Sequence, residues 1–71
     1  MKNNQTKYAL IEAVRQKHLA VMKSCEVNLD IYNNSVGIGE HGDLVSTAED
    51  IIQKWVEAKE MVEACHELLE A

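Results

Sequence analysis

The glycines in the middle of the chain form the pattern that most suggests chemistry. Residues 37–42 read Gly-Ile-Gly-Glu-His-Gly, which has the glycine spacing of a site that holds a dinucleotide pyrophosphate. Such a site needs a strand before the glycines, a helix after them and a second parallel strand within ~30 residues. After Gly42 the chain has room for one helix only. The pattern therefore favours a bend between two helices, with Asn33, Asn34 and Gly37 ending the first helix in left-handed conformations.

Glu63 and His66 form a candidate metal site. Glu-x-x-His on one helix, with a Glu at the same level on a partner helix, is how helical bundles build di-iron sites. If the chain reverses near Ile38, Glu12 lies at the matching height. Glu63 and His66, however, each follow an apolar position by one residue and so lie ~100° round the helix from it. The favoured interpretation is the solvated face of a Glu-rich helix, and a dimeric di-metal carboxylate protein is the less favoured alternative.

A third pattern is the recurrence of glutamates every three or four residues in the second half of the chain. The same recurrence occurs in the magnesium-binding helices of all-α nucleotide pyrophosphohydrolases. No second acidic cluster accompanies it in the first half, so an ordinary solvated helix face is favoured here too. The glutamates concerned are Glu57, Glu60, Glu63 and Glu67.

The remaining reactive side chains indicate packing rather than catalysis. His18 has Ala58 at its level, and neither a nucleophile nor a carboxylate, so we interpret it as a core or interface histidine. Cys25 and Cys65 are expected ~20 Å apart on two antiparallel helices, too far for an intrachain disulfide, and are expected to be free buried thiols. We therefore identify no catalytic residue and no cofactor, and expect that the protein is not an enzyme.

A heptad seam of apolar residues runs through the second half and predicts a helix over about 43–70. The helix start is expected between His41 and Ser46, because Ser46 with Glu49 matches a capping box and Asp43 is an equally good first-turn acid. The seam residues are Leu44, Ala48, Ile51, Trp55, Ala58, Val62, Cys65 and Leu69.

The first half predicts a helix over about 4–32 with a less regular seam, in which Asn28 is a candidate buried amide that fixes register. Residues 26–31 alternate between polar and apolar, which is also typical of a half-buried strand. Helix is favoured because the chain offers such a strand no partner. The seam residues are Ile11, Val14, His18, Val21, Cys25, Asn28 and Tyr32, flanked by Leu10, Met22 and Leu29.

These elements predict an all-α fold, a single helical-hairpin domain over residues 1–71 with arms ~40 Å long and a Gly-rich loop at 33–42. Two helices cannot cover the seam where Val45, Ile52 and Val56 widen it. Exposed apolar patches of that extent usually mark an interface. We therefore expect a homodimer that forms a four-helix bundle, with Val45, Ile52, Trp55 and Val56 in the interface.

The composition of the chain indicates which partners and which cell compartment to expect. The net charge is −5, which lacks the positive footprint of nucleic-acid binding. The charge is unevenly divided, +2 up to Asn34 and −7 beyond it. No apolar run approaches the ~18 residues of a membrane span, and the N-terminus is too polar for a signal peptide. The expectation is an acidic, soluble, cytoplasmic protein that binds neither nucleic acid nor membrane.

The stretch Asn-Asn-Ser-Val-Gly-Ile-Gly-Glu-His-Gly-Asp-Leu, residues 33–44, resembles a loop of short, largely uncharacterised helical proteins of tailed bacteriophages. Their shared pattern is Val-Gly-Ile-Gly-Glu-His-x-Asp, with a proline expected where this chain has Gly42. The resemblance implies no activity. It implies only that the shared loop includes, in this chain, Gly37, Gly39, Glu40, His41 and Asp43.

The combined expectation is a non-enzymatic protein-interaction module, a phage accessory protein that acts as a homo-oligomer on an unknown protein partner in the host cytoplasm. The alternative is a protein that binds or sequesters a small anion or nucleotide. In that case the five loop residues, with the free N–H groups at the start of the second helix, would form the site.

Overall fold

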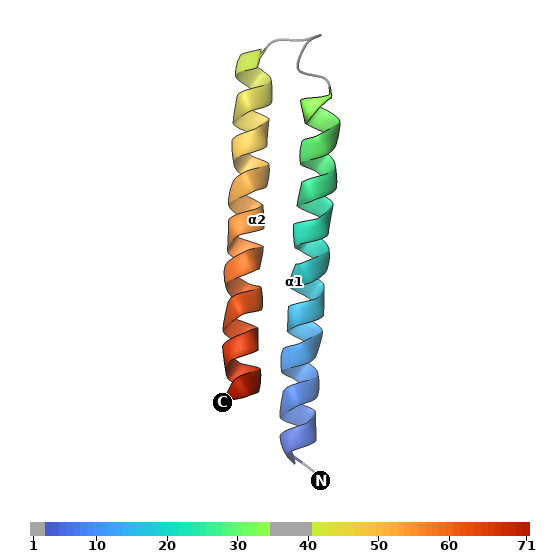
Figure 1. Cartoon of the computed structure of the whole chain (residues 1–71), viewed down its shortest axis with the longest axis vertical. Coiled ribbons are helices and arrows are strands. Elements are labelled where there is room, and N and C mark those ends of the chain that lie inside the picture. The colour runs from blue at the N-terminus through green and yellow to red at the C-terminus, as the bar shows by residue number, and fades with distance from the viewer. Residues whose placement is uncertain (1–2, 35–40) are drawn as a thin grey trace.

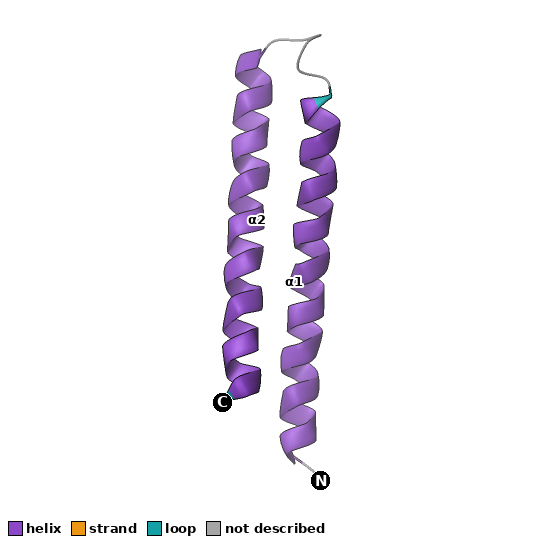
Figure 2. Cartoon of the chain, viewed as in Figure 1, coloured by secondary structure: helices purple, strands orange, loops and turns teal. Residues whose placement is uncertain are grey.

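In the computed structural model the chain is a helical hairpin (Figure 1). Helix α1 spans Asn3–Asn33 and helix α2 spans His41–Glu70. The two helices run antiparallel and pack along their length in a rod of 57 × 14 × 13 Å. The structure describes residues 3–34 and 41–71, with the side chains of 8–34 and 43–71. Within these ranges the chain is helical and contains no strand, as predicted for residues 26–31 (Figure 2).

The end of α1 differs from the predicted termination. The N–H of Asn34 donates to the carbonyl of Asp30 at 3.2 Å, which continues the helical pattern one residue past Asn33. Neither Asn33 nor Asn34 has a positive φ, so the predicted left-handed ending is wrong for both asparagines. An asparagine side chain tolerates the left-handed region without requiring it, and here the backbone bond keeps the right-handed conformation. Gly37, the third residue of that prediction, lies outside the described residues.

Helix α2 begins at the early limit of its predicted range. His41 and Gly42 are helical rather than part of the loop, and Asp43 lies in the first turn, where its charge favours the helix dipole. Ser46 therefore lies inside the helix, and the predicted capping box with Glu49 is wrong. A serine caps a helix only where the preceding residues are not helical.

The predicted seam of α2 is confirmed, because all eight of its residues are buried or half-buried against α1. Only three described side chains of the hairpin are fully buried, and all are small: Cys25 at 3% exposure, Ala58 at 2% and Cys65 at 4%. Both cysteines are free. The two helices thus meet along a thin line of small residues flanked by half-covered larger ones.

The contact line of α1 is rotated from the predicted seam. Ile11, His18, Val21 and Cys25 are covered as predicted, whereas Val14, Asn28 and Tyr32 are exposed. Asn28 is therefore not a buried register-fixing amide. The predicted flanking residues Met22 and Leu29 are half-buried in their place. Met22 and Leu29 bury more apolar surface than an amide does, and this difference favours the rotated packing.

Candidate functional site

The predicted loop site falls mostly outside the described residues. Gly37, Gly39 and Glu40 belong to 35–40. His41 starts α2, but its side chain is among those that the structure leaves undescribed. Asp43 is exposed in the first turn of α2. The loop therefore supplies no geometry from which a ligand site could be argued.

The three candidate metal ligands each pair with a neighbour on their own helix. Glu63 accepts an ion pair from Lys59 at 3.1 Å, and His66 Nε2 lies 3.1 Å from a carboxylate oxygen of Glu70. Both side chains are well exposed, at 58% and 66%. Across the described part of the chain, no group of three or more His, Cys, Asp or Glu side chains could hold a metal ion.

Glu12, the third candidate ligand, is held by α1 itself. Its carboxylate accepts hydrogen bonds from Arg15 Nε at 3.0 Å, Arg15 Nη2 at 2.8 Å and Gln16 Nε2 at 2.8 Å. The Arg15 hydrogen bonds, followed by that of Gln16, lower the pKa of Glu12 to about 2. Glu12 is thus a carboxylate that orients an arginine, and three of its about four acceptor sites are occupied by donors of its own helix.

One face of the hairpin carries an apolar ridge on α2, which we define as Val45, Ile52 and Val56. All three side chains are exposed, and their spacing of seven and four residues places them on one stripe. Trp55, next to the stripe, is half-buried and donates its indole N–H to the carboxylate of Glu26 on α1 at 3.0 Å. The ridge face therefore has a polar bond that joins the two helices.

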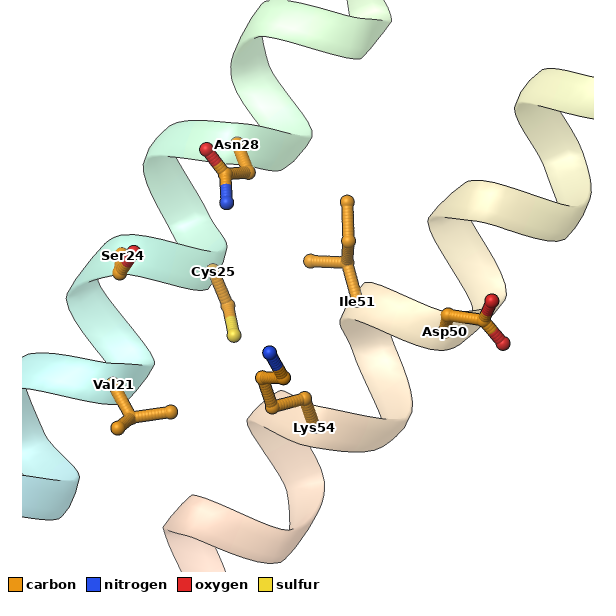
Figure 3. Close-up of a pocket in the computed structure, with 7 residues that line it drawn as sticks. All are labelled: Val21, Ser24, Cys25, Asn28, Asp50, Ile51 and Lys54. Carbon is orange, nitrogen blue, oxygen red and sulfur yellow. The ribbon is translucent and has the colours of Figure 1, made fainter.

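The other face carries a groove between the helices (Figure 3). Two hollows of 240 and 400 Å³ adjoin there, because Val21 and Lys54 line both. Their floor contains the small buried side chains of Cys25 and Ala58, so the groove exists where the seam residues are smallest. Ser24 also lines the groove, whereas Glu26 lies on the opposite side of Cys25 and bonds Trp55. The groove and the ridge are therefore on opposite faces of the hairpin.

Apolar side chains from both helices extend the groove toward the open end of the hairpin. Val14 lies two turns before Val21 on α1, and Leu68 lies two turns after the groove residue Met61 on α2. Leu10 lies one turn before Val14, and Leu10, Val14, Met61 and Leu68 are all exposed. We call these four residues, with Val21, the groove face.

The two faces differ in how their charges are satisfied. The stripe that continues the ridge along α2 contains the pairs Lys59–Glu63 and His66–Glu70. The groove is lined by Asp50, Lys54 and Glu57, and among the described side chains none of these makes an ion pair or a side-chain hydrogen bond. The groove thus combines an apolar surface with charged groups that have no partner within the hairpin.

Sequence reasoning missed the groove face. The predicted seam placed Val14 and Tyr32 inside the hairpin, so the sequence left only the ridge as surplus apolar surface. The small seam residues were a signal for this face. Cys25 on α1 and Ala58 on α2 let the two helices approach closely at the centre of the hairpin, and this leaves the larger side chains beside them uncovered.

Comparison of the chain with known protein families, with curated proteins and with solved structures finds no match. In the described part of the chain, no helix is long and apolar enough to cross a membrane. The ridge and the groove, on the two faces of the hairpin, are therefore the features from which we infer a function.

Proposed function

We propose that this chain is a non-enzymatic protein-interaction module that acts as a homodimer, in which two hairpins form a four-helix bundle. The observation that carries this proposal is the amount of apolar side chain left uncovered on both faces. Large hydrophobic residues such as Leu10, Val45 and Leu68 are more than half exposed, while the buried core consists of two cysteines and one alanine. An isolated helix pair with so little core is marginal in water.

The total exposed surface supports the same proposal. The hairpin exposes 5365 Å², whereas a folded monomer of 8.0 kDa is expected to expose about 4,450 Å². The surplus of about 900 Å² is close to the ~800 Å² that each partner buries in a standard protein interface. Lateral pairing of two rods removes this surplus directly, because each rod loses one long face to its partner.

The role proposed for the module is that of a phage accessory protein. The loop at residues 33–44, through its resemblance to loops of short tailed-phage proteins, supports this setting in the cytoplasm of the host. An outer surface rich in paired charges, with a short apolar ridge, suits contact with another protein. The sequence predicts a homodimer interface that contains Val45, Ile52, Trp55 and Val56, and we propose instead that they contact this other protein.

Sedimentation equilibrium over a wide concentration range tests the proposal. We expect a mass of twice the chain at micromolar concentration, falling toward one chain on dilution. Circular dichroism measured in parallel should show helix content decreasing with dissociation, because the separated hairpin has little core of its own. A fully helical monomer at several hundred micromolar would contradict the proposal.

A further inference from the structure

We propose that the second copy in this homodimer covers the groove face. The two hairpins point in the same direction, so that α1 of each copy lies on α2 of the other. This inference depends on the homodimer proposed above and adds to it the interface and the orientation. The ridge then remains on the outside of the bundle and is free to contact a different protein.

Both helices contribute to the groove face. Its exposed apolar side chains come from α1 (Leu10, Val14) and from α2 (Met61, Leu68), on the two sides of one groove. The core of a four-helix bundle is built from all four helices, and the groove face supplies apolar side chains from both helices of each copy.

The shape of the groove also suits a facing helix of the second copy. Its floor is formed by the small side chains of Cys25 and Ala58, with Val21 and Ile51 on its walls. A row of hollows along a helix pair accepts the larger side chains of a facing helix, as knobs fill holes in a coiled coil. The side chains that could fill these hollows, such as Met61 and Val14, lie exposed on the same face of the second copy.

The charges of the two helices determine the relative direction of the two hairpins. Helix α1 contains four basic and three acidic residues and has a net charge of +1, whereas α2 contains two basic and eight acidic residues and has a net charge of −6. If the hairpins pointed in opposite directions, a two-fold axis across the face would stack α2 on α2 and bring two strongly acidic helices together. A two-fold axis along the bundle instead stacks each α2 on the weakly basic α1, which avoids like-charge repulsion.

Individual charges in the groove agree with this direction. Asp50 and Glu57 line the groove on α2 without a partner, and Lys17 lies on α1 between the levels of Val14 and Val21. Stacking α1 on α2 of the second copy brings a lysine to the side of the bundle where unpaired carboxylates lie. The charges that the hairpin leaves unsatisfied are then close to opposite charges at the rim of the interface.

A matched pair of substitutions tests which face is covered. Met61 and Val56 have nearly equal exposure, 43% and 40%, and lie five residues apart on opposite flanks of α2. We expect Met61→Lys to raise the dimer dissociation constant at least about tenfold, because an ammonium is buried without a partner, and Val56→Lys to change it by less than about threefold. Val14→Lys on α1 should act like Met61→Lys. If Val56→Lys dissociates the dimer and Met61→Lys does not, the groove assignment is overturned while the homodimer stands.

A distance measurement on otherwise native protein tests the direction. A spin label at Asn34→Cys lies at the end of α1, and the native thiols of Cys25 and Cys65 are shielded by burial, which mass spectrometry of the labelled chain can verify. Hairpins that point the same way place the two labels within about 30 Å, whereas opposed hairpins separate them by about a helix length, ~45 Å. A long distance would overturn the inferred orientation. A monomer at every concentration would instead contradict the homodimer itself.

Discussion

The groove face and the ridge face belong to the same two helices but are built differently. On the ridge face the polar groups form bonds within the hairpin: Trp55 with Glu26 across the helices, and Lys59 with Glu63 along α2. On the groove face the helices meet through small side chains, and the charged groups at its edges have no partner in the described structure. The described polar groups of the ridge face are therefore bonded within the hairpin, whereas the charged groups that line the groove are not.

The difference shows what the small seam residues accomplish. A leucine in place of Ala58 would push the two helices apart at the point where they meet through small side chains. Because Cys25 and Ala58 are small, the helices leave room that a neighbouring molecule can fill. The size of the seam residues thus decides whether the apolar side chains beside them are covered by the chain itself or left open to a neighbouring molecule.

The largest expected effect comes from enlarging the buried seam residue Ala58. Ala58→Leu inserts a branched side chain at a position that is 2% exposed, so we expect the free energy of unfolding to fall by about 1–3 kcal/mol through overpacking. Urea denaturation followed by circular dichroism at a fixed protein concentration measures this change.

Ala20→Leu is the matched control for that experiment. Ala20 is exposed on α1 and lies five residues before Cys25, on the side of α1 that points away from α2, so the same substitution there should change stability by no more than about 0.5 kcal/mol. Equal effects of the two substitutions would mean that the groove deforms freely and that its shape carries no information about a partner.

A smaller effect is expected on the ridge face. Trp55→Phe removes the indole N–H that donates to Glu26, and Glu26→Gln removes the charge of the acceptor. A double-mutant cycle should give a coupling of about 0.5–1.5 kcal/mol, in the range of a net intramolecular hydrogen bond, because the contact is open to solvent. Thermal or urea unfolding of the four proteins supplies the cycle. Absence of coupling would show that the Trp55–Glu26 hydrogen bond, the one polar bond between the helices among the described residues of the ridge face, contributes nothing to stability.

The sequence predicted the fold better than it predicted the surfaces. The heptad spacing from Leu44 to Leu69 identified every covered residue of α2 among those described except Thr47, because a long regular repeat leaves a helix only one way to face its partner. The reversal of the chain between the helices was predicted from its glycines, although Gly42 belongs to α2, and the alternative use of these glycines in a nucleotide site lacked both strands.

The packing of α1 could not be predicted to the same accuracy. Two neighbouring stripes were available, one through Asn28 and Tyr32 and one through Met22 and Leu29, separated by about a quarter turn. The choice between them depends on how the side chains of both helices fit together, and no single helix pattern contains that information. The groove face follows from this choice, so it too was beyond the sequence.

The smallest expected effect concerns Glu12, whose bonds lie within α1 rather than between the helices. In the folded chain Arg15 and Gln16 lower its pKa from 4.5 to about 2, so the unfolded chain binds its proton first as the pH falls. The contribution of Glu12 is then complete above pH 4.5 and is lost between about pH 4.5 and 2. We expect wild type to lose more stability than Glu12→Gln between pH 5.5 and pH 3 when both are unfolded in urea, by a small margin because the pair is solvent-exposed. Parallel pH profiles of the two proteins would show that the charge of Glu12 adds no stability to the folded chain.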